Sequence, residues 1–166
     1  MTQSTPSNLD FDQMTPDQMT NVIDGFLNKG LALQNLQEIS DESMEELYRT
    51  GYNLYNGGRP QDAESMFQYL CILNHWQKKY WMGLAAARQV QKKYSEAIDA
   101  YSMAGLLEIT DPNVPFQAAI CHLGLGNVEK AKHALEGAVE LSANNNDLRS
   151  KAQGLLSTLK TAHKAS

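Results

Sequence analysis

The chain has 166 residues, of which 42% are hydrophobic, so it is long enough to fold around a core of its own. Its formal net charge of −5 argues against a nucleic-acid-binding surface, because such surfaces are basic. No apolar stretch approaches the roughly 20 residues of a membrane-spanning helix and no signal peptide opens the chain, so we expect a cytoplasmic protein without membrane or nucleic-acid partners.

The first 40 residues predict a polar start followed by one amphipathic helix. Residues 1–13 are rich in Ser, Thr, Gln and Asn, and we expect them to be mobile. In the helical segment over 14–40, Thr15 and Gln18 have the spacing of a capping box, and Gly30 is a typical helix stop. Between them apolar residues recur at helical spacing and form one stripe: Met19, Val22, Ile23, Phe26 and Leu27.

Residues 41–146 repeat with a period of 34. Small residues recur at Ala63, Ala97 and Ala131, and a second small-residue series follows the same period. This pattern is typical of tetratricopeptide helix pairs, in which small residues let two antiparallel helices approach closely. Capping and turn residues divide the region into six predicted helices: 41–56, 60–73, 77–91, 94–108, 114–124 and 128–142.

A last helix is expected over 147–163, in a C-terminal segment 147–166 that closes the stack. The sequence thus predicts an all-α fold. Three tetratricopeptide helix pairs would form a right-handed superhelix, between an N-terminal amphipathic helix and a C-terminal closing helix. Such stacks present a concave binding surface rather than a catalytic pocket. Cys71 and Cys121 are expected to be reduced thiols buried in helices.

The first helix of each predicted repeat is expected to line the concave surface. In repeat one, Tyr48, Tyr52 and Tyr55 form an aromatic stripe at helical spacing. These tyrosines could simply widen the core, but a phenol combines an apolar face with a hydroxyl that can stay wet, so we favour a groove lining. The corresponding positions of the next two repeats complete the predicted groove: Met82, Ala86, Gln89, Phe116, Ile120 and Leu123.

Several strings around the repeats carry a more specific signal. They are FLNKG at 26–30, LQEIS at 36–40, QYLCILNH at 68–75, GLAAARQ at 83–89 and PFQAA at 115–119. This series, in order and without large gaps from about residue 20 to 160, resembles the class II chaperones of bacterial type III secretion, which serve the translocator proteins. An ordinary tetratricopeptide protein would share the small-residue framework but not these strings.

The resemblance implies a cytosolic, non-enzymatic chaperone that holds hydrophobic translocators, major and minor, soluble and separate before export. It also implies that an extended client segment, with a short motif containing Pro and Leu, fills pockets in the concave groove. The family's groove tyrosines resemble Tyr48, Tyr52 and Tyr55. A basic clamp for a carboxylate terminus is missing from the predicted groove, so we expect it to bind internal apolar segments.

Other classes of function have weaker support. The four histidines show no HExxH spacing, and adjacent Cys121 and His122 would point about 100° apart on a helix, so no metal site or other cofactor is predicted. No nucleophile motif or phosphate-binding glycine loop is present, which argues against an enzyme. The main alternative is a scaffold or assembly adaptor built on the same repeats but without secreted clients.

The apolar stripe of the N-terminal helix lies outside the repeat pattern and must be covered. It could fold back on the first repeat, which a break at Gly30 would permit, or it could pack against a second chain. Members of the family that the chain resembles commonly dimerise through this region. We therefore favour a homodimer when the protein is free, with Met19, Val22, Ile23, Phe26 and Leu27 at its interface.

Overall fold

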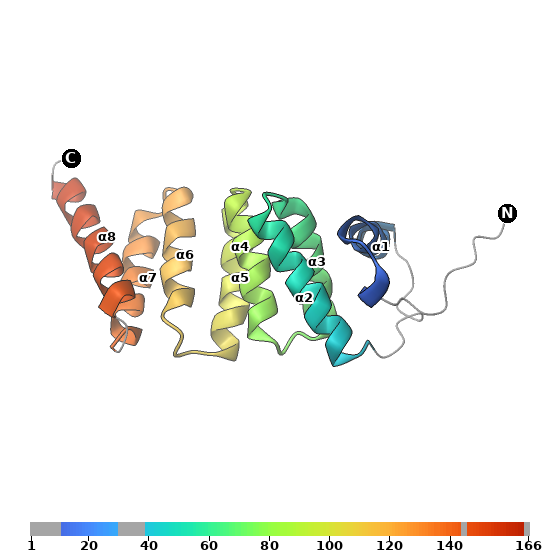
Figure 1. The fold of residues 1–166 in the computed structure, drawn as a ribbon. Helices are drawn as coiled ribbons and strands as arrows, with labels where there is room; N and C mark the ends of the chain where they lie inside the picture. The colour runs from blue at the N-terminus through green and yellow to red at the C-terminus, as the bar shows by residue number, and fades with distance from the viewer. Residues whose placement is uncertain (1–10, 30–38, 144–145, 165–166) are drawn as a thin grey trace.

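The computed structural model describes residues 11–29, 39–143 and 146–164, and within them it contains helices and no strand. The helices stack side by side in one row (Figure 1). They are η1 (Phe11–Gln13), α1 (Pro16–Lys29), α2 (Asp41–Asn56), α3 (Pro60–Leu73), α4 (Lys78–Val90), α5 (Tyr94–Leu107), α6 (Asn113–Gly124), α7 (Val128–Leu141) and α8 (Asn146–Lys164). None of the helices described has both the length and the hydrophobicity that crossing a membrane requires.

The helix ends lie within one residue of the predicted ones because local signals set them. Thr15 and Gln18 form the expected capping box, in which the Thr15 amide donates to Gln18 Oε1 at 2.8 Å and the Gln18 amide donates to Thr15 Oγ1 at 3.4 Å. The Ser40 hydroxyl caps α2 by accepting from the Ser43 amide at 3.1 Å. Residues 1–10 of the segment expected to be mobile lie outside the described residues. Its last three form η1 instead.

The 34-residue period has a structural counterpart in both the core and the turns. Ala63, Ala97 and Ala131 are all fully buried, as close helix packing requires. The turns inside the three repeats carry Gly58, Lys92 and Gly126, again 34 apart, and all three have a positive φ, of 76°, 61° and 74°. This left-handed conformation favours glycine, so repeat two holds a lysine where its neighbours hold the residue best suited to the turn.

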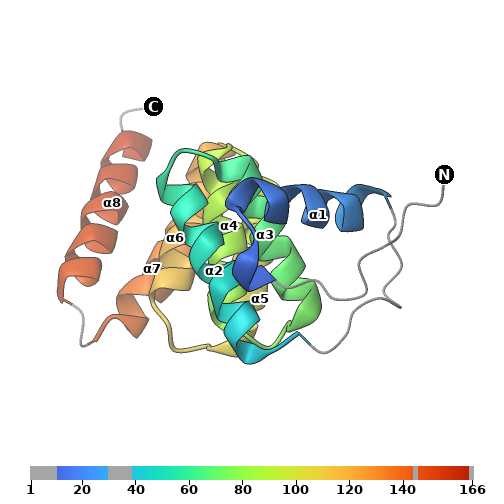
Figure 2. The same cartoon turned by 45° about the vertical axis from the view of Figure 1, so that its right-hand side comes forward.

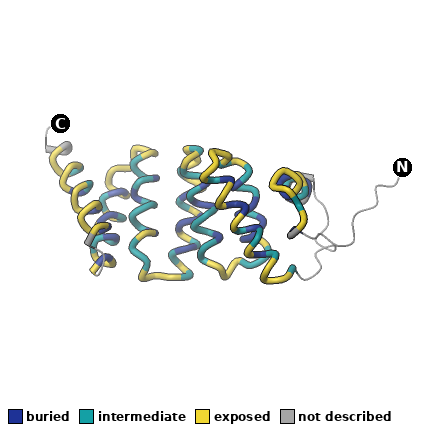
Figure 3. The backbone as a smooth tube through the Cα atoms, in the orientation of Figure 1, coloured by how far each residue is buried: buried dark blue, intermediate teal, exposed yellow. Residues whose placement is uncertain are grey.

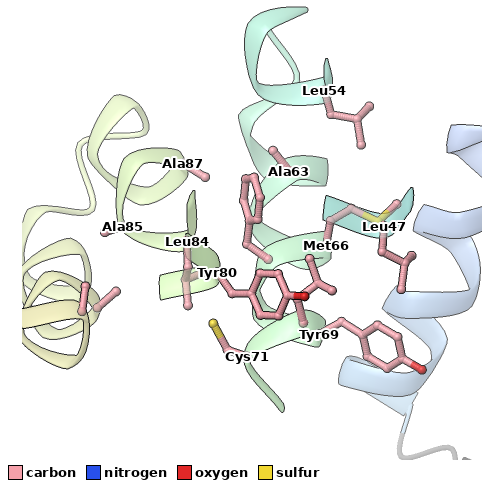
Figure 4. Packing of buried hydrophobic residues seen from close by; sticks show 14 of the residues in the cluster. Leu47, Leu54, Ala63, Met66, Tyr69, Cys71, Tyr80, Leu84, Ala85 and Ala87 are labelled. Carbon is pink, nitrogen blue, oxygen red and sulfur yellow. The ribbon is translucent and has the colours of Figure 1, made fainter. Parts of the chain in front are cut away.

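The interior is shared between successive helices rather than enclosed by any one pair. Buried positions follow the facing sides of the helices along the row (Figure 3). In Figure 4, side chains from α2, α3 and α4, such as Leu47, Met66 and Tyr80, point into a common interior. Cys71 and Cys121 are free and buried, and burial raises the pKa of Cys71 to about 12, so its thiol stays protonated and unreactive at neutral pH.

The N-terminal helix folds back on repeat one. It lies across α3 (Figure 2), and Met19 and Ile23 are buried in the core that repeat one shares with its neighbours. Phe11 is also buried, with its ring centroid 6.1 Å from that of Tyr69. The Ser65 hydroxyl donates to Asp24 at 3.0 Å and adds a polar link to the same contact.

This packing bears on the predicted dimer interface. Val22 and Leu27 are only partly buried, and the side chain of Phe26 lies outside the described residues. Met19 and Ile23, by contrast, are buried within their own chain. Folding back on repeat one was one of the two possibilities that the sequence left open; packing against a second chain was the other. A dimer that used their side chains would first have to lift α1 from α3.

A polar network joins repeat one to repeat two. The carboxylate of Glu64 in α3 accepts hydrogen bonds from Lys93 at 2.7 Å, from Gln91 at 2.8 Å and from Arg88 in α4 at 3.0 Å. Burial by itself would raise the pKa of Glu64, but the hydrogen bonds from Lys93, Arg88 and Gln91 outweigh it and lower that pKa. The network therefore stabilises the repeat junction only while Glu64 is ionised.

We expect the free energy of unfolding to fall when Glu64 takes up a proton. A carboxyl whose pKa is lower in the folded state stabilises the fold above its unfolded pKa, and this contribution is lost as the pH falls through the folded value. Glu64→Gln should cost about 1–3 kcal/mol at pH 7 and much less in acid. Urea unfolding at neutral and acidic pH checks this, and an equal cost at both would contradict the assigned role.

Candidate functional site

A hollow of about 540 Å³ lies between the first helices of repeats one and two. Its lining comes from α2, α3, α4 and the loops before α4 and after α5: Tyr48, Tyr52, Tyr55, Phe67, Gln77, Lys78, Lys79, Met82, Gly83, Ala86, Glu108 and Asp111. Five of the nine residues predicted to line a groove meet here, namely the three tyrosines, Met82 and Ala86. The structure thus places the aromatic stripe of repeat one opposite the matching stripe of repeat two.

The three tyrosines differ in how far they are available to a ligand. Tyr48 is partly buried, and its ring centroid lies 5.8 Å from those of both Phe67 and Tyr80. Tyr55 is also partly buried against the core, whereas Tyr52 is 54% exposed. All three tyrosines line the hollow, but Tyr48 and Tyr55 also pack against the core, which leaves the ring of Tyr52 the most exposed.

Phe67 forms part of the floor, and two glycines make room for its ring. A Cβ added to Gly51 in α2 would lie 3.1 Å from Phe67 Cε1, and one added to Gly83 in α4 would lie 2.6 Å from it. The ring thus lies against the bare backbone of two helices and is almost fully buried. Ala86, about one helical turn after Gly83, also lines the hollow, and its short side chain leaves space for an incoming side chain.

One end of the hollow is charged, and its charges are paired. Lys78 at the start of α4 contacts Asp111 and Glu108, the latter at 2.9 Å. Lys79 pairs with Glu45, and its ammonium lies 4.6 Å from the ring centroid of Tyr48. Burial alone would raise the pKa of Asp111, but hydrogen bonds from Lys78 and Asn113 lower it, so the carboxylate stays ionised at neutral pH.

The other predicted groove residues lie outside this hollow. Gln89 accepts a hydrogen bond from the Tyr101 hydroxyl at 2.6 Å and donates to Gln117 at 3.2 Å, so it links three helices. Phe116 is partly buried and packs on the core that α6 shares with α7 and α8. Ile120 and Leu123 are also partly buried in α6. Their part in a longer groove stays a prediction.

Sequence reasoning missed the charged end altogether. Lys78 and Asp111 are 33 residues apart, and no motif in the chain couples them. Phe67 was likewise not among the predicted groove residues, although it lines the hollow. The one available signal was Gly83, since a glycine inside a predicted helix commonly marks a close approach of another group.

The arrangement suits binding of an apolar chain. Aromatic rings and Met82 provide an apolar lining, and paired charges border one end. In the part of the chain that the structure describes, no three His, Cys, Asp or Glu side chains lie together as a metal centre would need. His122 Nδ1 is buried without a hydrogen-bond partner, but its residue does not line the hollow.

Comparison with known proteins gives relatives over most of the chain. A family model described as "Tetratricopeptide repeat" matches residues 44–77 and 79–104. "Low calcium response locus protein H" of Yersinia pestis is 36% identical over 127 residues, which cover 76% of this chain and 76% of that protein. "Chaperone protein SicA" of Salmonella typhimurium is 35% identical over 136 residues, with 82% of each chain covered.

Solved structures show the same fold with ligands bound. PcrH in complex with the chaperone-binding region of PopD matches with a TM-score of 0.73 at 37% identity, covering 78% of this chain and 98% of that one. SycD of Yersinia enterocolitica with a peptide of the translocator YopD matches with a TM-score of 0.73 at 35% identity, covering 76% and 99%. SycD is also known in an alternative dimer, with the same TM-score and identity, covering 76% and 98%.

Proposed function

Because the chain belongs to the family of type III secretion translocator chaperones, we propose that its groove holds an extended apolar segment of a translocator protein. Binding there would keep the client soluble in the cytoplasm and separate from its partner translocator until export. The chain would act by binding alone, without catalysis. The relatives are named as chaperones, and the solved complexes contain PopD and YopD segments.

The observation that carries the proposal is the exposed ring of Tyr52 above a preformed apolar floor. Tyr52 is more than half exposed although it is a large aromatic residue, and Phe67, Met82 and Ala86 line the same hollow. An exposed aromatic at the centre of a concave apolar surface is a typical anchor for a bound peptide. We also propose that the free protein forms a homodimer through α1, as the family resemblance implies.

Copurification tests the proposed function. We expect this chain, expressed together with PopD or YopD, to hold at least one of them in the soluble fraction and to elute with it from a tag on the chaperone. PcrH with PopD is the positive control, and each translocator expressed alone is the negative control. If PcrH retains PopD while this chain retains neither translocator, the proposed function is wrong.

Binding is expected to depend only weakly on salt. The lysines at the hollow already have carboxylate partners, so an incoming segment gains little from them, and apolar contacts are not screened. Between about 0.05 and 0.5 M NaCl, the dissociation constant of the PopD chaperone-binding region should change by less than roughly threefold. Fluorescence titration measures it. A loss of tenfold or more would point to an electrostatic partner.

A further inference from the structure

Two loops on one edge of the array present large apolar side chains to solvent. Trp76, in the loop between α3 and α4, is 73% exposed, and Ile109, in the loop between α5 and α6, is 76% exposed. Leu106, at the end of α5, is 74% exposed. Both loops lie at the lower edge of the row in Figure 1, opposite the turns inside the repeats. We name Trp76, Leu106 and Ile109 the loop-edge surface.

Hydrogen bonds fix the first loop with Trp76 turned outward. The Trp81 indole donates to the His75 carbonyl at 2.8 Å, and the Trp76 amide donates to Asn74 Oδ1 at 3.1 Å. The His75 and Trp76 rings lie 4.6 Å apart, centroid to centroid. The indole is therefore exposed on a loop whose backbone is held at His75 and at Trp76 by these two hydrogen bonds.

The second loop is held in a similar way and is tied to the first. Asp111 Oδ1 accepts from both the amide and the side chain of Asn113, each at 2.9 Å. Lys78, two residues after Trp76, pairs with Glu108 and Asp111, which flank Ile109. This ion pair keeps the two loops together, so their exposed apolar side chains belong to one edge rather than to two independent segments.

Both loops beside the loop-edge surface also contribute residues to the hollow. Gln77 and Lys78 line the hollow and directly follow Trp76, and Glu108 and Asp111 line it on either side of Ile109. The hollow therefore reaches this edge of the array. At about 540 Å³ it has room for a few side chains only, so any longer chain bound in it has to leave it, and the loop edge borders one way out.

We propose that the loop-edge surface is a second client site, on which the translocator chain packs a further apolar segment after it leaves the hollow. The proposal rests on the proposed function. It names the occupant by chemistry: an apolar stretch of the same polypeptide, joined to the segment in the hollow. Because the two segments are linked, the second binds at a high effective concentration, which lengthens the life of the complex even if its own affinity is low.

The test compares a short and a long client on matched variants. The triple variant Trp76→Ser/Leu106→Ser/Ile109→Ser removes the loop-edge surface. Tyr52→Ala removes the anchor in the hollow, and Leu125→Ser changes an exposed apolar residue at the opposite edge. The short probe is the PopD chaperone-binding region, titrated to obtain its Kd. The long probe is full-length PopD copurified with each variant, whose dissociation is followed after addition of excess unaltered chaperone.

We expect the loop-edge variant to release full-length PopD about tenfold faster, with the Kd of the short probe unchanged within twofold. Tyr52→Ala should weaken the short probe and hasten release of PopD, and Leu125→Ser should do neither. If Tyr52→Ala behaves as expected but the loop-edge variant releases PopD at the unaltered rate, this inference is wrong and the proposed function stands. If the unaltered chain itself retains no full-length PopD, both the inference and the proposed function are wrong.

Sedimentation of the same variants shows whether the loop-edge surface binds the client or a second copy of the chain. If the loop-edge surface binds the client, the loop-edge variant should self-associate as the unaltered chain does. A variant that loses self-association while it releases PopD at the normal rate would show that the loop edge joins two chaperones, and this outcome would overturn the proposal. Circular dichroism should show equal helix content in all variants, because the three loop-edge side chains are exposed.

Discussion

Phe67→Ala is expected to lower the free energy of unfolding by about 3–5 kcal/mol, the typical cost of removing a buried aromatic side chain. The ring is only 2% exposed and packs against Gly51, Gly83 and the ring of Tyr48. Total stabilities of single domains are about 5–15 kcal/mol, so this one change should remove a large part of the stability of the fold. Urea unfolding followed by circular dichroism at 222 nm gives the difference.

Gly83 provides a sharper form of this test, because the sign of its effect should depend on Phe67. In the unaltered chain, Gly83→Ala forces a Cβ to within 2.6 Å of the ring and should cost about 1–3 kcal/mol. In the Phe67→Ala background the added methyl group enters a cavity, and alanine is the better helix former by about 1 kcal/mol. Gly83→Ala should then be stabilising.

Gly154 is the matched control, since it lies in α8 and a Cβ there meets no atom within 4 Å. Gly154→Ala should stabilise the fold by up to about 1 kcal/mol in both backgrounds. A double-mutant cycle over Gly83 and Phe67 should therefore show strong coupling, and one over Gly154 and Phe67 should show none. If Gly83→Ala stabilises the unaltered chain as Gly154→Ala does, the floor of the hollow is not packed as described.

The array could be predicted from the sequence because its signals are local or strictly periodic. Ser40, for example, caps α2 through a hydrogen bond to a residue three positions later, and such caps are legible in any sequence. The burial of Ala97 follows from its place in a series with a fixed period. The same period relates Tyr52 and Ala86, and the structure brings both to one hollow.

Features that depend on pairing between distant residues could not be predicted in this way. The capping box marks where α1 begins, but not whether Met19 packs on its own chain or on another. Gln89 has a groove position by period, yet its amide is used by Tyr101 and Gln117, because helices packed at one particular angle bring these groups within reach. Lys78 likewise pairs with carboxylates from the loop after α5. The residues next to Lys78 in the sequence give no sign of this pairing.

Tyr52→Ala is expected to weaken binding of the PopD chaperone-binding region by about 10- to 100-fold, as truncation of a central aromatic anchor commonly does. The ring is 54% exposed, so its removal should leave the helix content and the free energy of unfolding nearly unchanged. Isothermal titration calorimetry measures the dissociation constant. The loss should appear mainly as a faster dissociation rate, because the groove is preformed.

Tyr52→Phe separates the role of the ring from that of the hydroxyl. If the segment packs on the apolar face, the phenylalanine variant should bind within about threefold of the unaltered chain. Ser157→Ala in α8 is exposed and distant in the row from α2, so it serves as the control for nonspecific effects. Equal binding by Tyr52→Ala and the unaltered chain would show that Tyr52 does not anchor the segment, whatever other contacts the segment makes.

Site-specific photocrosslinking tests most directly whether the client lies in this groove. A benzophenone side chain placed at Met82, inside the hollow, should form a covalent product with the PopD chaperone-binding region under near-ultraviolet light. The same group at Ser157 on α8 should not. Competition by unlabelled peptide should abolish the product at Met82. A product at Ser157 with none at Met82 would contradict the account, because it would place the translocator segment on another face of the array.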